Sequence, residues 1–302
     1  MKVDVIGYPI YYGCDVKGVE KAYDYLKMNN VFDLLRTNCE VNDLGKVLVE
    51  EVKSADKYLG HDKLKYLNPI AKSSELLASK VSESLSNGNF PLVIGGDHSM
   101  AIGSISGLSS FYSVDDISVI WVDAHIDIND EISSPTGNIH GMPLRVLLGT
   151  GDRRLTDVSS QGPKIKSENI YYIGVRSFEK QEMDFVKESN ICCYYDCDIK
   201  ERGMGAILEE VLAKIKTKYI HVSFDVDVIN QEIFMATGVT QIPHALVVGG
   251  IDLDQAKEVL EATLKDSRVK SMDFTEFNPD LDVNNSSLEI CKELFGVIGN
   301  NL

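Results

Sequence analysis

Short apolar runs alternate with longer amphipathic stretches along the chain. The apolar runs are rich in β-branched residues and occupy 3–7, 91–95, 117–122, 169–173, 191–195, 219–224 and 269–274. Runs that are apolar at nearly every position are typical of strands buried on both faces. Apolar positions recur at helical spacing in residues 17–36, 68–86, 179–188, 203–216, 252–265 and 286–298. This alternation predicts a mostly parallel sheet covered by helices.

The domain organisation follows from the continuity of this pattern. No linker, low-complexity tract or internal repeat interrupts it, and the Gly- and Ser-containing stretches near 133–163 and 228–250 are predicted to be loops. We therefore expect residues 1–302 to form one α/β domain with three layers, α/β/α, around a mostly parallel central sheet. Ligands of such sheets bind outside the carboxyl ends of the strands, where we expect the functional site.

The charge of the chain narrows the class of partner. Thirty basic and 46 acidic side chains give a formal net charge of −16, which repels nucleic acid and anionic lipid and favours a small cationic ligand. No run of 18 apolar residues is present, and the first twenty residues lack the apolar stretch of a signal peptide. We expect a cytoplasmic protein with no nucleic-acid or membrane partner.

Cysteine usage agrees with a reducing compartment. The six cysteines, at 14, 39, 192, 193, 197 and 291, are too sparse for a disulfide scaffold. Three of them cluster at 192–197, but the C-x2-C spacing of thiolate zinc sites is missing. Small thiols are common in buried apolar runs, so we favour a structural role over a metal site.

Acidic and histidine side chains follow three of the predicted strands, in residues 95–99 (GGDHS), 123–127 (DAHID) and 223–227 (SFDVD). Alternate side chains of an extended segment point to the same side, so each strand end offers a set of candidate ligands. Six groups would converge if these strands are neighbours: His98, Asp123, His125, Asp127, Asp225 and Asp227. Two imidazoles and four carboxylates exceed the needs of one divalent ion and suit a binuclear centre.

Each of these residues, taken alone, would more often be a turn former, a helix cap or a structural histidine. Together, however, the three clusters would crowd several carboxylates without a cation to offset their repulsion. The pattern therefore favours a metal centre.

The GGDHS, DAHxD and SxDxD blocks, in this order, resemble the ureohydrolases, a superfamily that includes arginases, agmatinases, guanidinobutyrases and formiminoglutamases. The similarity extends from residues 6–7 to 276–279. It implies an arginase/deacetylase-like fold and two Mn²⁺ per chain. The resemblance assigns one ion to His98, Asp123, Asp127 and Asp225 and the other to His125, Asp123, Asp225 and Asp227, so that Asp123 and Asp225 bridge.

Residues 127–141 (DINDEISSPTGNIHG) are most similar to the substrate loop of arginases. The resemblance implies that four side chains bind the substrate α-carboxylate, directly or through water: Asn129, Ser134, Thr136 and Asn138. Hydroxyl and amide donors can pair a carboxylate without a positive charge that would repel a cationic substrate. Without the resemblance, such a segment would be interpreted as an ordinary surface loop.

Three further residues have counterparts in arginases. His140 corresponds to the proton-shuttle histidine and Glu276 to the glutamate that pairs the guanidinium, a planar fork that suits a carboxylate. Glu179 stands where arginases have an aspartate that contacts the α-amino group. The alternative for Glu179 is a glutamate that only stabilises a helix start.

We therefore hypothesise an arginase-type hydrolase that converts L-arginine to L-ornithine and urea. A metal-bridging hydroxide would attack the guanidinium carbon, and Asp127 would pass a proton to the leaving amine. Two alternatives stay open. One is hydrolysis of agmatine or another guanidino or formimino substrate, and the other is a non-catalytic arginase-like binding protein.

The chain departs from the family pattern near its third signature. Asn230 and Gln231 replace an Asp-Pro pair, Met235 replaces a proline, and residues 239–248, which include His244, lengthen the next loop. Family members form trimers or hexamers. Asp254 and Gln255 stand where many arginases have the Arg and Glu that support trimer contacts, so a homo-oligomer is not settled by the resemblance.

Overall fold

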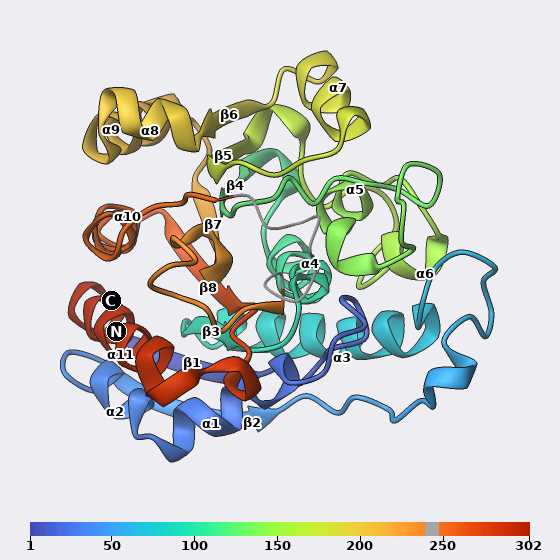
Figure 1. The fold of residues 1–302 in the computed structure, drawn as a ribbon, viewed down its shortest axis with the longest axis horizontal. Coiled ribbons are helices and arrows are strands. Elements are labelled where there is room, and N and C mark those ends of the chain that lie inside the picture. Colours follow the sequence, from blue (N-terminus) through green and yellow to red (C-terminus); the bar gives the residue numbers. More distant parts are fainter. Residues whose placement is uncertain (239–247) are drawn as a thin grey trace.

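Eight parallel strands form one sheet in the computed structural model, which describes residues 1–238 and 248–302 (Figure 1). The strand order across the sheet is β2-β1-β3-β8-β7-β4-β5-β6. The strands are β1 (Lys2–Gly7), β2 (Glu40–Lys46), β3 (Phe90–Ile94), β4 (Ile117–Val122), β5 (Ile170–Val175), β6 (Cys192–Tyr195), β7 (Tyr219–Asp225) and β8 (Val269–Thr275). Helices cover both faces, which confirms the three-layer α/β/α prediction.

Each face of the sheet is packed against its own hydrophobic core. Alternate residues of one strand enter opposite cores: in β4, Ile120 and Val122 belong to one, and Val119 and Trp121 to the other. The first core is closed by α1 (Ala22–Met28), α2 (Val31–Leu35), α8 (Asp196–Arg202), α9 (Met204–Lys214), α10 (Leu253–Leu264) and α11 (Ser286–Asn301). The second is closed by α3 (Leu67–Ser86), α4 (Ala101–Phe111), α5 (Pro143–Leu147), α6 (Arg153–Thr156) and α7 (Lys180–Glu188).

The sequence analysis missed one strand. All seven predicted runs are strands, whereas β2 has the polar sequence EVNDLGK and was not predicted. It is an edge strand that stays partly exposed along its length, so it lacks the continuous apolar run of the central strands.

Several helix predictions were also incomplete. The predicted stretch 17–36 is broken at Asn30, which has a left-handed backbone (φ 59°). The predicted loop 133–163 contains the short helices α5 and α6, and α8 and α4 were not predicted. Helix α4 is buried over most of its length and has no polar face to reveal its period. Its Gly107 lies against α3, where an added Cβ would come within 2.6 Å of the Ala78 carbonyl oxygen.

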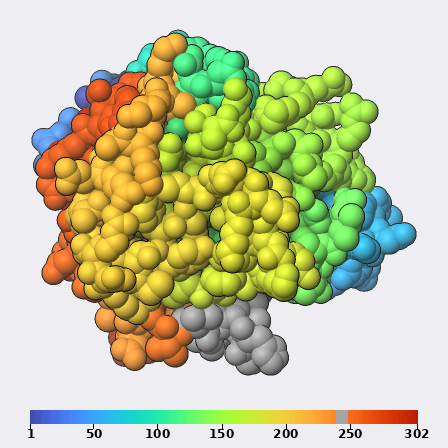
Figure 2. Space-filling view, turned by 90° about the horizontal axis from the view of Figure 1, so that it is seen from above, coloured from blue at the N-terminus to red at the C-terminus, as the bar shows by residue number. Residues whose placement is uncertain are grey.

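Strand β6 is an edge strand, and the segment that contains α7, α8 and α9 flanks it on both faces of the sheet (Figure 1). This segment, yellow in the space-filling view, forms most of the surface seen from above in Figure 2. No helix in the described ranges is long and apolar enough to cross a bilayer. All six cysteines lie in the described part and are free thiols.

The strand order brings the predicted site together. Strands β3, β8, β7 and β4 are successive neighbours in the middle of the sheet. In the chain, however, β7 and β8 come long after β3 and β4. Because all strands are parallel, their carboxyl ends lie along one edge. Residues 95–99, 275–276, 225–227 and 123–127 follow these four strands.

Candidate metal centre

The turn after β3 is shaped by glycine and capped by aspartate. Gly96 has a φ of 85°, and a Cβ there would lie 2.5 Å from the Tyr8 carbonyl oxygen, so only glycine fits without displacing the backbone. The Asp97 carboxylate then accepts hydrogen bonds from the backbone N–H of Ser99 (3.0 Å) and of Gly13 (2.8 Å). Together these contacts fix the position of the next residue, His98.

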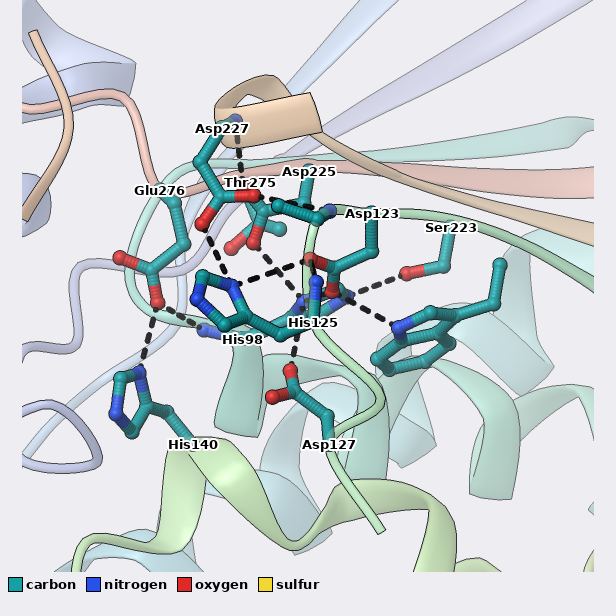
Figure 3. A network of polar contacts seen from close by, with 12 residues as sticks. His98, Asp123, His125, Asp127, His140, Ser223, Asp225, Asp227, Thr275 and Glu276 are labelled. Carbon is teal, nitrogen blue, oxygen red and sulfur yellow. Dashed lines mark hydrogen bonds and ion pairs between the residues drawn. The ribbon is translucent and has the colours of Figure 1, made fainter. Parts of the chain in front are cut away.

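His98 faces three carboxylates on neighbouring strand ends (Figure 3). Its Nδ1 lies 2.9 Å from Asp123 Oδ2, 3.1 Å from Asp225 Oδ2 and 3.2 Å from Asp127 Oδ2. The imidazole stacks on Trp121, with ring centroids 4.0 Å apart and planes 6° apart. Trp121 also donates from Nε1 to Asp123 Oδ2 at 2.9 Å. The indole therefore holds both the ring and one of the carboxylates that the ring faces.

Asp123 lies between the two histidines. While its Oδ2 faces His98, its Oδ1 lies 3.5 Å from His125 Nδ1, and Asp227 Oδ2 lies 3.0 Å from the same His125 nitrogen. The two ligand sets, each within 4.8 Å, are His98, Asp123 and Asp127, and Asp123, His125 and Asp227. They share Asp123, so one carboxylate is placed where it could bridge two ions.

The close packing of these carboxylates and imidazoles shifts their pKa values. Burial alone would lower the pKa of His98 and of His125, but the facing carboxylates raise both well above the usual value. Burial and neighbouring carboxylates raise the pKa of Asp127 to about 6 and that of Asp225 well above its usual range. Burial would also raise the pKa of Asp123, but the two imidazoles hold it low. Protons here balance charge that a cation would otherwise balance.

The donor set fits a pair of divalent cations. Among the described residues, the buried His98 Nδ1 has no hydrogen bond of good geometry, although three carboxylate oxygens lie close to it. In the neutral ring this nitrogen carries a lone pair, and a bound cation would supply the partner that it lacks. Carboxylates with a minority of imidazoles bind several divalent ions, Mn²⁺ among them.

Two of the site residues have a strained backbone. Asp127 has a φ of 51° and Glu276 a φ of 65°, values that non-glycine residues rarely adopt. Glu276 Oε1 accepts a hydrogen bond from the His98 backbone N–H at 2.9 Å and lies 3.3 Å from His140 Nδ1. Burial alone would lower the pKa of His140, but the bond to Glu276 raises it. Glu276 and His140 thus form a hydrogen-bonded pair beside the metal ligands (Figure 3).

Comparison with known proteins identifies the family. The model of the arginase family matches residues 5–297. The chain belongs to the arginase family. The arginase of Staphylococcus aureus (strain MRSA252) is 35% identical over 97% of this chain and 95% of that protein. The Bacillus subtilis arginase structure is 34% identical and covers 99% of this chain and 98% of its own, with a TM-score of 0.90. The Entamoeba histolytica arginase in complex with L-ornithine is 27% identical over 99% and 97%, with a TM-score of 0.89.

The arginase-family centre opens into a cavity of about 550 Å³. It is lined by the metal-ligand candidates His125, Asp127, Asp225 and Asp227, and by Asn129, Ser134, Thr136, Asn138, His140, Glu179, Glu182 and Glu276. His98 and Asp123 lie beneath its floor, almost fully buried. The cavity therefore brings together every substrate-contact residue that the sequence analysis named.

Ser134 and Thr136 donate no hydrogen bond from their hydroxyl groups to any described residue. Ser134 Oγ accepts from the Gly137 backbone N–H at 3.0 Å, and Thr136 Oγ1 accepts from the Asn138 N–H at 3.1 Å. Because each oxygen is used as an acceptor, its hydrogen can still be donated to an anion in the cavity. Asn138 is more constrained, since its amide donates to the Cys14 carbonyl (3.0 Å) and accepts from Lys65 Nζ (2.7 Å).

A pair of glutamates forms another wall of the cavity. Glu179 precedes α7 and accepts from Asn129 Nδ2 at 3.0 Å, while Glu182 accepts from the backbone N–H of Glu179 and of Ile128 at 3.0 and 3.1 Å. Burial, with a hydrogen bond to Glu179, raises the pKa of Glu182 to about 9. The hydrogen bond to Glu182 lowers the pKa of Glu179. Glu182 thus favours its protonated form and Glu179 its ionised form.

Glu182→Gln is expected to remove a pH-dependent cost of folding. Between the ordinary pKa of 4.5 and the folded value of about 9, the folded chain holds a proton that the unfolded chain lacks, so wild-type stability falls as pH rises. The neutral amide avoids this loss. In chelator-treated protein, we expect the free energy of unfolding of the variant, relative to that of wild type, to increase by about 1–3 kcal/mol from pH 5 to pH 8. Urea unfolding at each pH measures this difference.

Glu188→Gln is the matched control, because Glu188 is an exposed glutamate on the same helix. Its stability should follow the wild-type pH dependence. If the free energies of unfolding of Glu182→Gln and wild type changed with pH by the same amount, Glu182 would not be the group that carries the extra proton.

The sequence analysis named the candidate ligands but not their supports. No supporting role was predicted for Glu182, Trp121, Ser223 or Asp273, which contact site residues, although Ser223 lies within the SxDxD block. A glutamate three residues after a helix cap is the signal that would have found Glu182.

Two departures from the family pattern have a local explanation. Asn230 accepts a hydrogen bond from the Glu232 backbone N–H at 2.9 Å and so forms a turn. Gln255 forms a capping box with Asp252 at the start of α10, with bonds of 2.8 and 2.9 Å, while the neighbouring Asp254 side chain is almost fully exposed. His244 and residues 239–247 lie outside the described residues.

Proposed function

We propose that this chain hydrolyses L-arginine to L-ornithine and urea with two Mn²⁺ bound. The proposed ligands are His98, Asp123, His125, Asp127, Asp225 and Asp227, with Asp123 and Asp225 bridging. Membership of the arginase family and the shared position of Asp123 between two ligand sets support the proposal. The free thiols support action in the cytoplasm, and the charge of −16 disfavours a nucleic-acid partner.

The observation that carries the proposal is the composition of one cavity. Its lining combines carboxylates and imidazoles with hydroxyl and amide donors on residues 129–138. An amino acid with a guanidinium side chain suits this lining, because the guanidinium pairs with carboxylates and the α-carboxylate pairs with the donors. The ornithine complex of the Entamoeba histolytica relative agrees with an amino-acid product.

The metal ions, Glu276 and Asp127 have separate roles in the proposed reaction. When bound, the two Mn²⁺ supply Lewis-acid activation of a water molecule as the nucleophile. Glu276 pairs the guanidinium and turns its carbon towards that water. Asp127 would take up the proton that the attacking water gives up, on Oδ1, the oxygen that does not face His98, and pass it to the leaving amine.

His140 and Glu179 act at the edges of the same cavity in this proposal. The imidazole of His140 is about one-quarter exposed and beside Glu276, so it can move protons between the cavity and bulk water. The negative charge of Glu179 would attract the α-ammonium group.

Ser134→Ala separates arginine from agmatine, which lacks the α-carboxylate. We expect KM for L-arginine to rise about tenfold, the loss of one hydrogen bond to a charged group, with little change for agmatine. The measurement is steady-state urea release with both substrates. Ser133→Ala is the matched control, since Ser133 also accepts a loop N–H bond but does not line the cavity. Equal effects of Ser134→Ala on both substrates would contradict the carboxylate assignment.

A further inference from the structure

A buried hydrogen-bond network lies behind His98, on the side away from the cavity. Asp273 is its centre, and we call Asp273, Ser104, His221, Ser223 and Ser271 the Asp273 network. All five residues are at most 1% exposed. Two pairs of this network are set by strand register, because β7 and β8 align His221 with Ser271 and Ser223 with Asp273.

Asp273 receives three hydrogen bonds. Its Oδ1 accepts from Ser223 Oγ at 2.6 Å, and its Oδ2 accepts from Ser104 Oγ at 2.5 Å and from His221 Nε2 at 3.0 Å. Burial alone would raise the pKa of Asp273, but His221 and these hydrogen bonds lower it. The carboxylate therefore stays ionised in the core, where it acts as an acceptor only.

This arrangement determines which nitrogen of His98 carries the proton. The Ser223 hydroxyl has one hydrogen, and Asp273 takes it. Ser223 Oγ can then only accept in its 2.8 Å contact with His98 Nε2, so Nε2 is the protonated nitrogen (Figure 3). In the neutral ring Nδ1 then carries a lone pair, and it is this atom that faces Asp123, Asp127 and Asp225.

We propose that the Asp273 network is the positioning device of one metal site: through Ser223 it keeps the His98 proton on Nε2 and directs the Nδ1 lone pair to the ion. The proposal rests on the proposed function, because it needs His98 to be a ligand. Among the described residues no member of the network bonds to His125. The network thus acts on the His98 ion and leaves the His125 ion alone.

Ser223→Ala tests this in the full-length chain. The variant removes the acceptor for His98 Nε2–H, and Asp273 keeps two of its three donors. In a calorimetric titration of metal-free protein with Mn²⁺, we expect one of the two binding steps to weaken about 10–100-fold, as for other groups that orient a metal-bound histidine, and the other step to change little. At a Mn²⁺ concentration that fills both sites of wild type, the electron paramagnetic resonance spectrum should change from a spin-coupled pair to isolated Mn²⁺.

Ser104→Ala is the matched control, because it removes a donor from the same carboxylate but leaves the Ser223 link to His98 intact. Both of its Mn²⁺ steps should stay near the wild-type values. Ser223→Thr keeps the hydroxyl and should retain the spin-coupled spectrum, which covers the case in which Ser223→Ala does not fold.

Three results would overturn the proposal. One is equal weakening of both steps in Ser223→Ala, which would indicate general loss of structure. Another is the same loss in Ser104→Ala, and the third is unchanged binding in Ser223→Ala. If wild type itself fails to bind two Mn²⁺, the proposed function is wrong and this proposal falls with it, and the wild-type titration alone identifies that case.

Discussion

Asp225→Ala is expected to abolish Mn²⁺ binding and urea formation together. Asp225 is 2% exposed, lies 3.1 Å from His98 Nδ1 and accepts from the Asp227 backbone N–H at 2.7 Å. Its removal takes away a proposed bridging ligand and a support for a second one. We expect kcat/KM to fall at least about 10³-fold, equivalent to about 4 kcal/mol of transition-state stabilisation. The measurement combines urea release with metal content of the same dialysed sample.

Asp4→Ala is the control for this variant. Asp4 is also a 2%-exposed aspartate, but it lies on β1 and accepts from Asn42 and Asn89 instead of facing the centre. Its loss should reduce stability while leaving the metal content at the wild-type value. Two Mn²⁺ bound to Asp225→Ala with wild-type affinity would contradict the ligand assignment.

Glu276→Gln is expected to remove activity while sparing the metal. The amide oxygen can still accept from the His98 backbone N–H, so the turn after β8 keeps its contact. However, the neutral side chain no longer forms an ion pair with the guanidinium. Its NH₂ group is a hydrogen-bond donor at the position where the guanidinium needs an acceptor. We expect kcat/KM for L-arginine to fall about 10²–10³-fold, the range for a lost charged contact to a reacting group.

The metal content of Glu276→Gln distinguishes its role from that of Asp225. We expect close to the wild-type Mn²⁺ content, because Glu276 faces His140 and the backbone of His98, not the imidazole nitrogen of the ligand set. Loss of Mn²⁺ from this variant, or activity near that of wild type, would contradict the substrate-pairing role.

The centre of the sheet and the candidate ligands could be predicted from the sequence because both depend on local pattern. Central parallel strands are apolar on both faces, and the ligands lie at their carboxyl ends, as Asp123 does directly after β4 and Asp225 as the last residue of β7. Strand β2 and helix α4 could not be found in this way, because one is a polar edge strand and the other has no polar face.

The supports of the site depend on contacts that sequence spacing does not encode. Ser223 and Asp273 are fifty positions apart and meet only because β8 lies next to β7 in this register. Trp121 looks like any apolar strand residue, yet it stacks on His98. Such pairs follow from strand order, which alternation of strands and helices leaves open.

Urea release by Mn²⁺-loaded protein from L-arginine and agmatine in parallel, with metal content determined on the same sample, tests the central claim most directly. We expect a large kcat/KM preference for L-arginine with close to two Mn²⁺ per chain. No urea from either substrate at full metal loading would contradict the claim and point to another guanidino or formimino substrate. A chain that binds no Mn²⁺ would contradict it and point to a non-catalytic member of the family.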